Sequence, residues 1–125
     1  MKNLICASVL GLLSVAMGAF GAHALEDILE PDSLRSYETG VRYMLIHAVV
    51  LLFLNNSSVL DLKTKNTLSY LFITGIVFFS GSIFAITLKL IPASSIWFIT
   101  PLGGLLLISG WLGMALAFFR KYRED

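Results

Sequence analysis

The sequence has little charge and almost no cysteine. Charged side chains make up 14% of its 125 residues, whereas a soluble domain usually carries about 25%. Hydrophobic residues make up 57%, so we expect the chain to lie in a lipid bilayer. The single cysteine, Cys6, excludes an intramolecular disulfide, Cys-x-x-Cys redox chemistry and a thiolate metal cage. The nine Lys and Arg residues are scattered, and we expect no nucleic-acid partner.

Four long apolar stretches stand out, at residues 4–25, 41–60, 66–88 and 96–119. Each has about 20 residues or more, enough for a helix to cross a hydrocarbon core of roughly 30 Å. Residues 31–43 read as an amphipathic helical extension of the second stretch, begun by Pro31, with Glu38 and Arg42 spaced for an ion pair. The sequence therefore predicts an all-α, integral membrane four-helix bundle that forms one domain, residues 1–125.

The first stretch ends in Ala22-His23-Ala24, which has the small-x-small form of a signal-peptidase site. A signal peptide has an apolar region of about 7–15 residues, and the run here is longer. It also carries small residues at spacings of 4, 3, 4 and 3, a stripe that lets membrane helices approach closely: Ala7, Gly11, Ser14, Gly18 and Gly21. We expect the segment to be retained as a membrane helix rather than cleaved as a signal peptide.

Lys and Arg residues predict the orientation, because they are enriched in cytoplasmic loops. With four spans, both termini and the second loop share one side of the membrane. That side holds six of the nine basic residues: Lys2, Lys63, Lys65, Arg120, Lys121 and Arg123. The opposite side holds Arg35, Arg42 and Lys89. We expect both termini in the cytoplasm, or in the matrix of an organelle.

Polar and small side chains are expected to gather in the outer half of the spans. The polar candidates for a ligand-contacting cluster are His23, Tyr43, His47, Ser80, Ser82 and Thr100. The glycines expected at helix contacts are Gly11, Gly18, Gly21, Gly81, Gly103, Gly104 and Gly110. Hydroxyls in membrane helices often bond the carbonyl one turn back, and glycines often serve packing alone.

The two histidines differ from the other candidates, because an ionisable side chain inside a span is costly and often functional. His47 lies about two turns inside the second span, and Tyr43, one turn earlier, is its expected partner. It is either a neutral, hydrogen-bonded structural imidazole or a functional group. His23, within a turn of the surface, reads as an interfacial residue. Trp111, near mid-membrane, is expected to be packed, with its indole N–H bound to a local acceptor.

These residues fall within four motifs: GAFGAHAL at 18–25, TGVRYMLIH at 39–47, FSGS at 79–82, and TPLGG followed by GW within 100–111. In this order they resemble the four-span membrane family catalogued as domain of unknown function 423, which includes bacterial YgdD-type and YwdK-type proteins and has vertebrate transmembrane protein 256 as a relative. Glu38, where the family pattern has Gln, is a departure. The resemblance implies a multi-pass protein of the bacterial inner (plasma) membrane and no established reaction.

Three functions fit these features. The first is a non-enzymatic partner or assembly subunit of a membrane complex, or a homo-oligomer. The second is an outer-facing site for a quinone, lipid or haem, although His23 and His47 are expected to differ in depth by about five residues, which disfavours haem. The third is a small transporter, weakened by spans without Asp or Glu. No catalytic set, metal site or cofactor is predicted, so we expect no enzyme.

Overall fold

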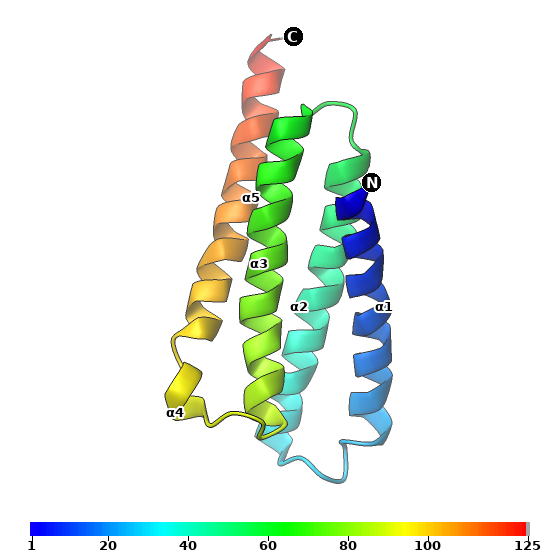
Figure 1. Ribbon diagram of the computed structural model, residues 1–125, viewed down its shortest axis with the longest axis vertical. Helices are drawn as coiled ribbons and strands as arrows, with labels where there is room; N and C mark the ends of the chain where they lie inside the picture. Colours follow the sequence, from blue (N-terminus) through cyan, green and yellow to red (C-terminus); the bar gives the residue numbers. More distant parts are fainter. Residues whose placement is uncertain (125) are drawn as a thin grey trace.

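The computed structural model describes residues 1–124, and Asp125, the last residue of the predicted domain, lies outside them. Four long helices run up and down, and no strand occurs among these residues (Figure 1). Each long helix is long and apolar enough to cross a membrane, which confirms the predicted all-α fold. The helices are α1 (Lys2–His23), α2 (Pro31–Asn56), α3 (Leu62–Thr87) and α5 (Ile99–Glu124), with one short turn, α4 (Ala93–Ile96), before the last.

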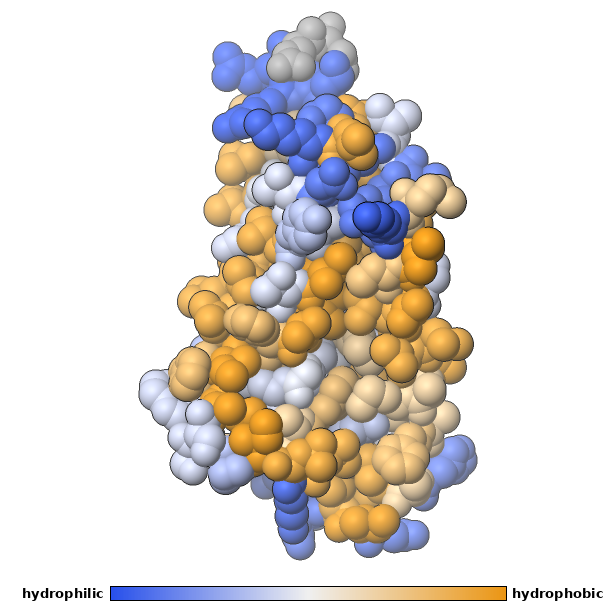
Figure 2. Space-filling model, viewed as in Figure 1, coloured by the Kyte–Doolittle hydropathy of each residue, from blue (hydrophilic) through white to orange (hydrophobic). Residues whose placement is uncertain are grey.

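The two ends of the molecule are distinct. Both chain termini lie at the same end as the α2–α3 connection, which we name the terminal end (Figure 1). The α1–α2 connection and α4 lie at the opposite end, which we name the α4 end. Hydrophilic side chains gather at both ends, and apolar side chains cover the middle (Figure 2). A belt of this kind is expected of a protein whose middle faces lipid.

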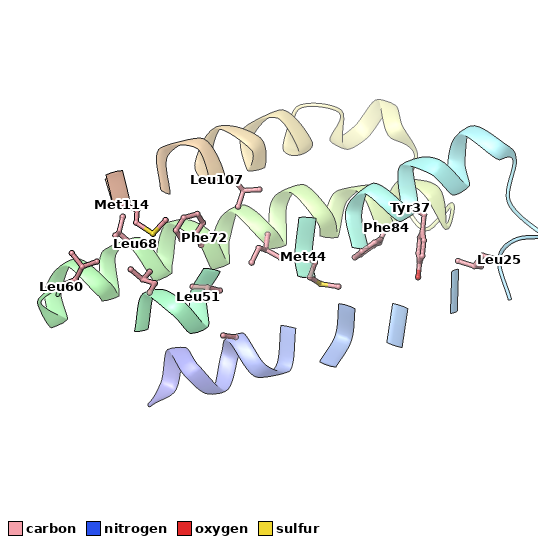
Figure 3. Packing of buried hydrophobic residues seen from close by; sticks show 13 residues of the cluster. Leu25, Tyr37, Met44, Leu51, Leu60, Leu68, Phe72, Phe84, Leu107 and Met114 are labelled. Carbon is pink, nitrogen blue, oxygen red and sulfur yellow. The ribbon is translucent and has the colours of Figure 1, made fainter. Parts of the chain in front are cut away.

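Each long helix packs mainly on its neighbours in the chain. The extensive interfaces join α1 to α2, α2 to α3, and α3 to α5, and the buried side chains lie along these contacts (Figure 3). The central helices α2 and α3 therefore carry the fully buried large residues Tyr37, Leu51 and Phe72. Lipid is as apolar as these side chains, so close packing and hydrogen bonds hold the helices together.

The second helix is continuous from the predicted extension through the span. Pro31 stands in its first turn, as the sequence predicts, since proline at this position loses no helical hydrogen bond. Glu38 and Arg42, although spaced for an ion pair, form none among the residues that the structure describes. Arg35 pairs with Asp32 of the first turn, at 3.9 Å between nitrogen and oxygen. Both side chains are largely exposed, so the pair contributes little to stability.

Three of the predicted glycines lie at tight helix contacts. A Cβ on Gly21 would come within 2.7 Å of the Tyr37 ring, and one on Gly110 within 2.8 Å of Phe72. A Cβ on Gly103 would overlap the backbone nitrogen of Phe79. Only a residue without a side chain permits the α3 and α5 backbones to approach this closely.

The other four predicted glycines are not tightly packed. Gly11 and Gly81 have nothing within 4 Å of a built Cβ, and Gly18 and Gly104 have only ordinary contacts at 3.4 and 3.8 Å. Sequence spacing indicates which residues share a face, but it does not say whether a neighbour covers that face. For the same reason three tight positions were not predicted: Gly40, Gly75 and Gly113.

Substitution of Gly103 tests the α3–α5 contact. We expect Gly103→Ala to lower the free energy of unfolding by about 1–3 kcal/mol, because the added methyl group forces the two backbones apart. The matched control is Gly81→Ala, where open space surrounds the position and alanine favours the helix by up to about 1 kcal/mol. Thermal unfolding in detergent measures both, and equal stability of the two variants would contradict the contact.

Candidate functional site

His47 lies near the centre of the bundle, deeper than its predicted position. At the terminal end, the Asn3 side chain bonds that of Asn55, and toward the α4 end Gly21 lies against Tyr37. This antiparallel register places His47 level with residue 11 or 12 of α1. His23 lies 11 or 12 residues further along, roughly 17 Å at 1.5 Å per residue. The expected difference of about five residues is therefore too small, because it counted the depth of His47 from residue 41, whereas α2 packs along α1 from its first turns onward.

Both ring nitrogens of His47 are hydrogen-bonded. Nδ1 lies 2.7 Å from the backbone oxygen of Tyr43, and Nε2 lies 3.2 Å from the indole nitrogen of Trp111. A carbonyl oxygen only accepts and an indole N–H only donates. The pattern therefore assigns the proton to Nδ1 of a neutral ring, because a proton on Nε2 would face the indole N–H. His47 is 4% exposed, and both of its partners come from the protein.

Aromatic rings surround the imidazole. Phe72 lies with its ring centroid 5.7 Å from that of His47 and 6.0 Å from that of Trp111. Tyr43 lies 5.8 Å from His47 and 4.6 Å from Phe79. The predicted Tyr43–His47 pairing is present, but Tyr43 contributes its carbonyl and its ring face. Trp111 supplies the second partner. The sequence analysis expected its indole N–H to bond a local acceptor, and in the structure this acceptor is Nε2 of His47 on another helix.

The cluster connects helices that otherwise do not pack extensively. His47 belongs to α2 and Trp111 to α5, and Phe72 of α3 packs against both rings. A ligand that used the Nε2 lone pair of His47, such as haem iron or a metal ion, would displace the Trp111 bond. The described residues contain no group of three or more His, Cys, Asp or Glu side chains placed to hold a metal. The geometry therefore favours the structural interpretation of His47.

The three hydroxyl candidates lie nearer the α4 end and bond across helix interfaces. Ser80 is buried and donates to the backbone oxygen of Gly40 at 2.7 Å, which joins α3 to α2. Ser82 and Thr100 share a hydrogen bond of 2.6 Å, which joins α3 to α5. His23 is exposed at the end of α1. The six predicted residues therefore lie in three places. The side chains with hydroxyl groups, Ser80, Ser82 and Thr100, lie nearer the α4 end. Tyr43 and His47 lie near the centre of the bundle, and His23 lies alone at the end of α1.

A polar network at the terminal end was missed by the sequence analysis. The amide nitrogen of Asn3 donates to the side-chain oxygens of Asn55 and Asn66, at 3.1 and 2.9 Å. Asn55 in turn donates to Ser69 Oγ at 2.8 Å and to the backbone oxygen of Leu51 at 2.9 Å. The network joins α1, α2 and α3. The available signal was three asparagines, each near a predicted end of a span on the same side.

The fold and these bonds define a class of protein: a four-span helical membrane protein in which several polar side chains within the spans are paired between helices. The chain belongs to the family described as "Protein of unknown function (DUF423)", which matches residues 17–104. This match confirms the resemblance drawn from the four motifs.

Several curated relatives cover nearly the whole chain. The UPF0382 membrane protein of Haemophilus influenzae is 35% identical over 120 residues, 96% of this chain and 95% of its own. The membrane protein YwdK of Bacillus subtilis is 36% identical over 91% of this chain and 93% of its own. The inner membrane protein YgdD of Escherichia coli is 32% identical over 97% and 92%. Their names give no activity, and no solved structure matches the chain.

A double-mutant cycle tests the His47–Trp111 bond. Trp111→Phe keeps an aromatic ring but removes the N–H donor, which leaves the buried Nε2 without a partner. We expect a coupling free energy with His47→Leu of about 0.6–1.7 kcal/mol, the range measured for hydrogen bonds between membrane helices. Trp97→Phe, at an exposed position outside the long helices, is the control. Strictly additive effects of the two substitutions would contradict the bond.

Proposed function

We propose that the protein is a non-enzymatic partner or assembly subunit of a complex in the bacterial plasma membrane. The observation that carries this proposal is that the buried polar side chains form hydrogen bonds within the protein. Among the described residues, no buried side-chain nitrogen or oxygen lacks a hydrogen-bond partner. Buried polar groups that already satisfy one another do not require a ligand or substrate. The helix surfaces that face the membrane are then where the protein meets other molecules.

One of these surfaces differs from an ordinary lipid-facing surface. Exposed residues on α3 recur at spacings of 3 and 4, and several are small or polar: Thr67, Tyr70, Thr74, Val77 and Gly81. We name this row the α3 track. Figure 2 shows pale side chains over α3, interrupted by apolar ones. Open space around Gly81 would let another helix approach closely, and such residues are enriched where membrane helices meet. These features support a partner helix as the occupant of the track.

Photo-crosslinking in intact membranes tests the partner role. A photoreactive residue at Thr74, on the α3 track, is expected to yield an adduct with a second membrane protein. The same residue at Leu112, which is exposed on α5, is the lipid-facing control. Gly81→Phe should abolish the Thr74 adduct, because it fills the track, whereas Gly81→Ala should keep it. If mild detergent releases only a monomer or homo-oligomer and position 74 yields no adduct, the proposal fails.

We further propose that α1 is retained and that the terminal end faces the cytoplasm. Tyr37 of α2 is fully buried against α1, and its hydroxyl donates to the backbone oxygen of Met17 at 2.9 Å. Cleavage after Ala24 would expose this residue and remove its acceptor. The excess of Lys and Arg at the terminal end supports the orientation.

Epitope tags at both ends test retention and orientation together. We expect both tags to stay on one chain and to resist protease added to intact spheroplasts, because both lie on the cytoplasmic side. Lysis of the spheroplasts should make both tags digestible, which serves as the control. Loss of the N-terminal tag would contradict retention, and digestion of either tag before lysis would contradict the orientation.

A further inference from the structure

A hollow of about 580 Å³ lies at the terminal end between α3, α5 and the α2–α3 connection. Its volume is within the range of roughly 300–1,000 Å³ typical of small-molecule sites. Its deeper wall is apolar and is formed by Leu68 and Leu71 of α3 and by Gly113, Leu116 and Ala117 of α5. Because this part lies within the membrane-spanning length of both helices, an acyl chain suits it better than water does.

The mouth of the same hollow is basic. Lys63, in the first turn of α3, lines it together with Arg120 and Lys121 of α5. Gly113 lies against Leu68, so the antiparallel register brings Arg120 level with the start of α3. The distance from this level to the Gly113 level is about 10 Å at 1.5 Å per residue. The lining of the hollow is therefore apolar at its deeper end and cationic at its mouth. A phospholipid has the same order, with its acyl chains in the membrane and its phosphate at the surface.

Asp61 is the acidic residue of the lining, and its charge is engaged elsewhere. Its carboxylate accepts hydrogen bonds from the Thr64 hydroxyl at 2.6 Å and from the backbone nitrogens of Thr64 and Lys63 at 3.2 and 3.1 Å. The bonds from Thr64 hold the pKa of the Asp61 carboxyl below its usual value. The carboxylate thus caps α3. Among residues 1–123, no carboxylate forms an ion pair with Lys63 or Arg120.

We propose that this hollow binds one anionic phospholipid, with an acyl chain along its apolar wall and the phosphate at Lys63 and Arg120. A guanidinium group binds phosphate oxygens in a bidentate manner, and basic pockets between membrane helices suit anionic head groups. A free phosphate would leave the apolar wall uncovered. A zwitterionic lipid would bring its own cation to the basic mouth. The hollow and the α3 track share Thr67, but the inference does not rest on the proposed partner role.

Native mass spectrometry of the full-length protein in neutral detergent measures the binding. The probes are phosphatidylglycerol, phosphatidylcholine with the same acyl chains, and soluble glycerol 3-phosphate. We expect one retained phosphatidylglycerol per chain, weaker binding of phosphatidylcholine, and no displacement by glycerol 3-phosphate. Equal binding of the two lipids would overturn the charge selection, and displacement by glycerol 3-phosphate would identify a phosphate site instead of a lipid site.

Two pairs of variants locate the binding. Lys63→Gln with Arg120→Gln should weaken phosphatidylglycerol binding about thirtyfold, from the loss of two charges near the head group. Lys65→Gln with Arg123→Gln removes two charges at the same end but outside the lining and should cost less than about fivefold. Equal losses in these two double variants would indicate general surface attraction and overturn the site.

The second pair tests the apolar wall. Ala117→Leu should reduce occupancy by filling the wall, whereas Ala115→Leu, exposed on α5 away from the hollow, should not. Thermal unfolding of all four variants shows whether each remains folded. Unchanged binding in Ala117→Leu would overturn the placement of the acyl chain.

Discussion

A bilayer supplies no water to its hydrocarbon core, so a polar group in a span must find its partner inside the protein. Several buried or half-buried polar side chains here do so by bonding a group on another helix. Tyr37 reaches Met17, Ser80 reaches Gly40, and Asn55 reaches Ser69. His47 is met from α5 by Trp111. These bonds require short distances between helices, and the need for short distances explains where the glycines lie.

Near the α4 end, each of the three helix interfaces combines one glycine contact with one hydroxyl bond. Gly21 meets the ring of Tyr37 at α1–α2, and Gly40 meets Phe84 while accepting from Ser80 at α2–α3. Gly103 meets the backbone at Phe79 beside the Ser82–Thr100 bond at α3–α5. At the terminal end, the asparagine network links α1, α2 and α3 but leaves out α5. The hollow lies where this link is missing, between α3 and α5.

The sequence predicted what depends on composition and helical period, and it missed what depends on register. The four spans, the small stripe of α1 and the start of α2 at Pro31 follow from apolar length, spacing and proline geometry. The depth of His47 did not follow, because a period identifies a face of a helix but not the residue opposite it. The sequence identified Tyr43 as a partner of His47, but it did not indicate that the backbone carbonyl of Tyr43 forms the bond. For the same reason Asn3 was not connected with Asn55, 52 residues away.

The His47–Trp111 bond gives α5 an attachment that the α3 interface alone does not provide. Apart from its packing on α3, α5 reaches α2 through this bond near the middle of the bundle. The α4-end half of α5 is fixed on α3 by Gly103 and by Thr100, whereas its terminal half borders the hollow. Leu71, at the deep end of the hollow, lies close to the level of Trp111 by the same register. A molecule in the hollow would therefore reach the level of the histidine bond, and it would fill a gap in the terminal half of the α3–α5 interface, far from the Ser82–Thr100 bond.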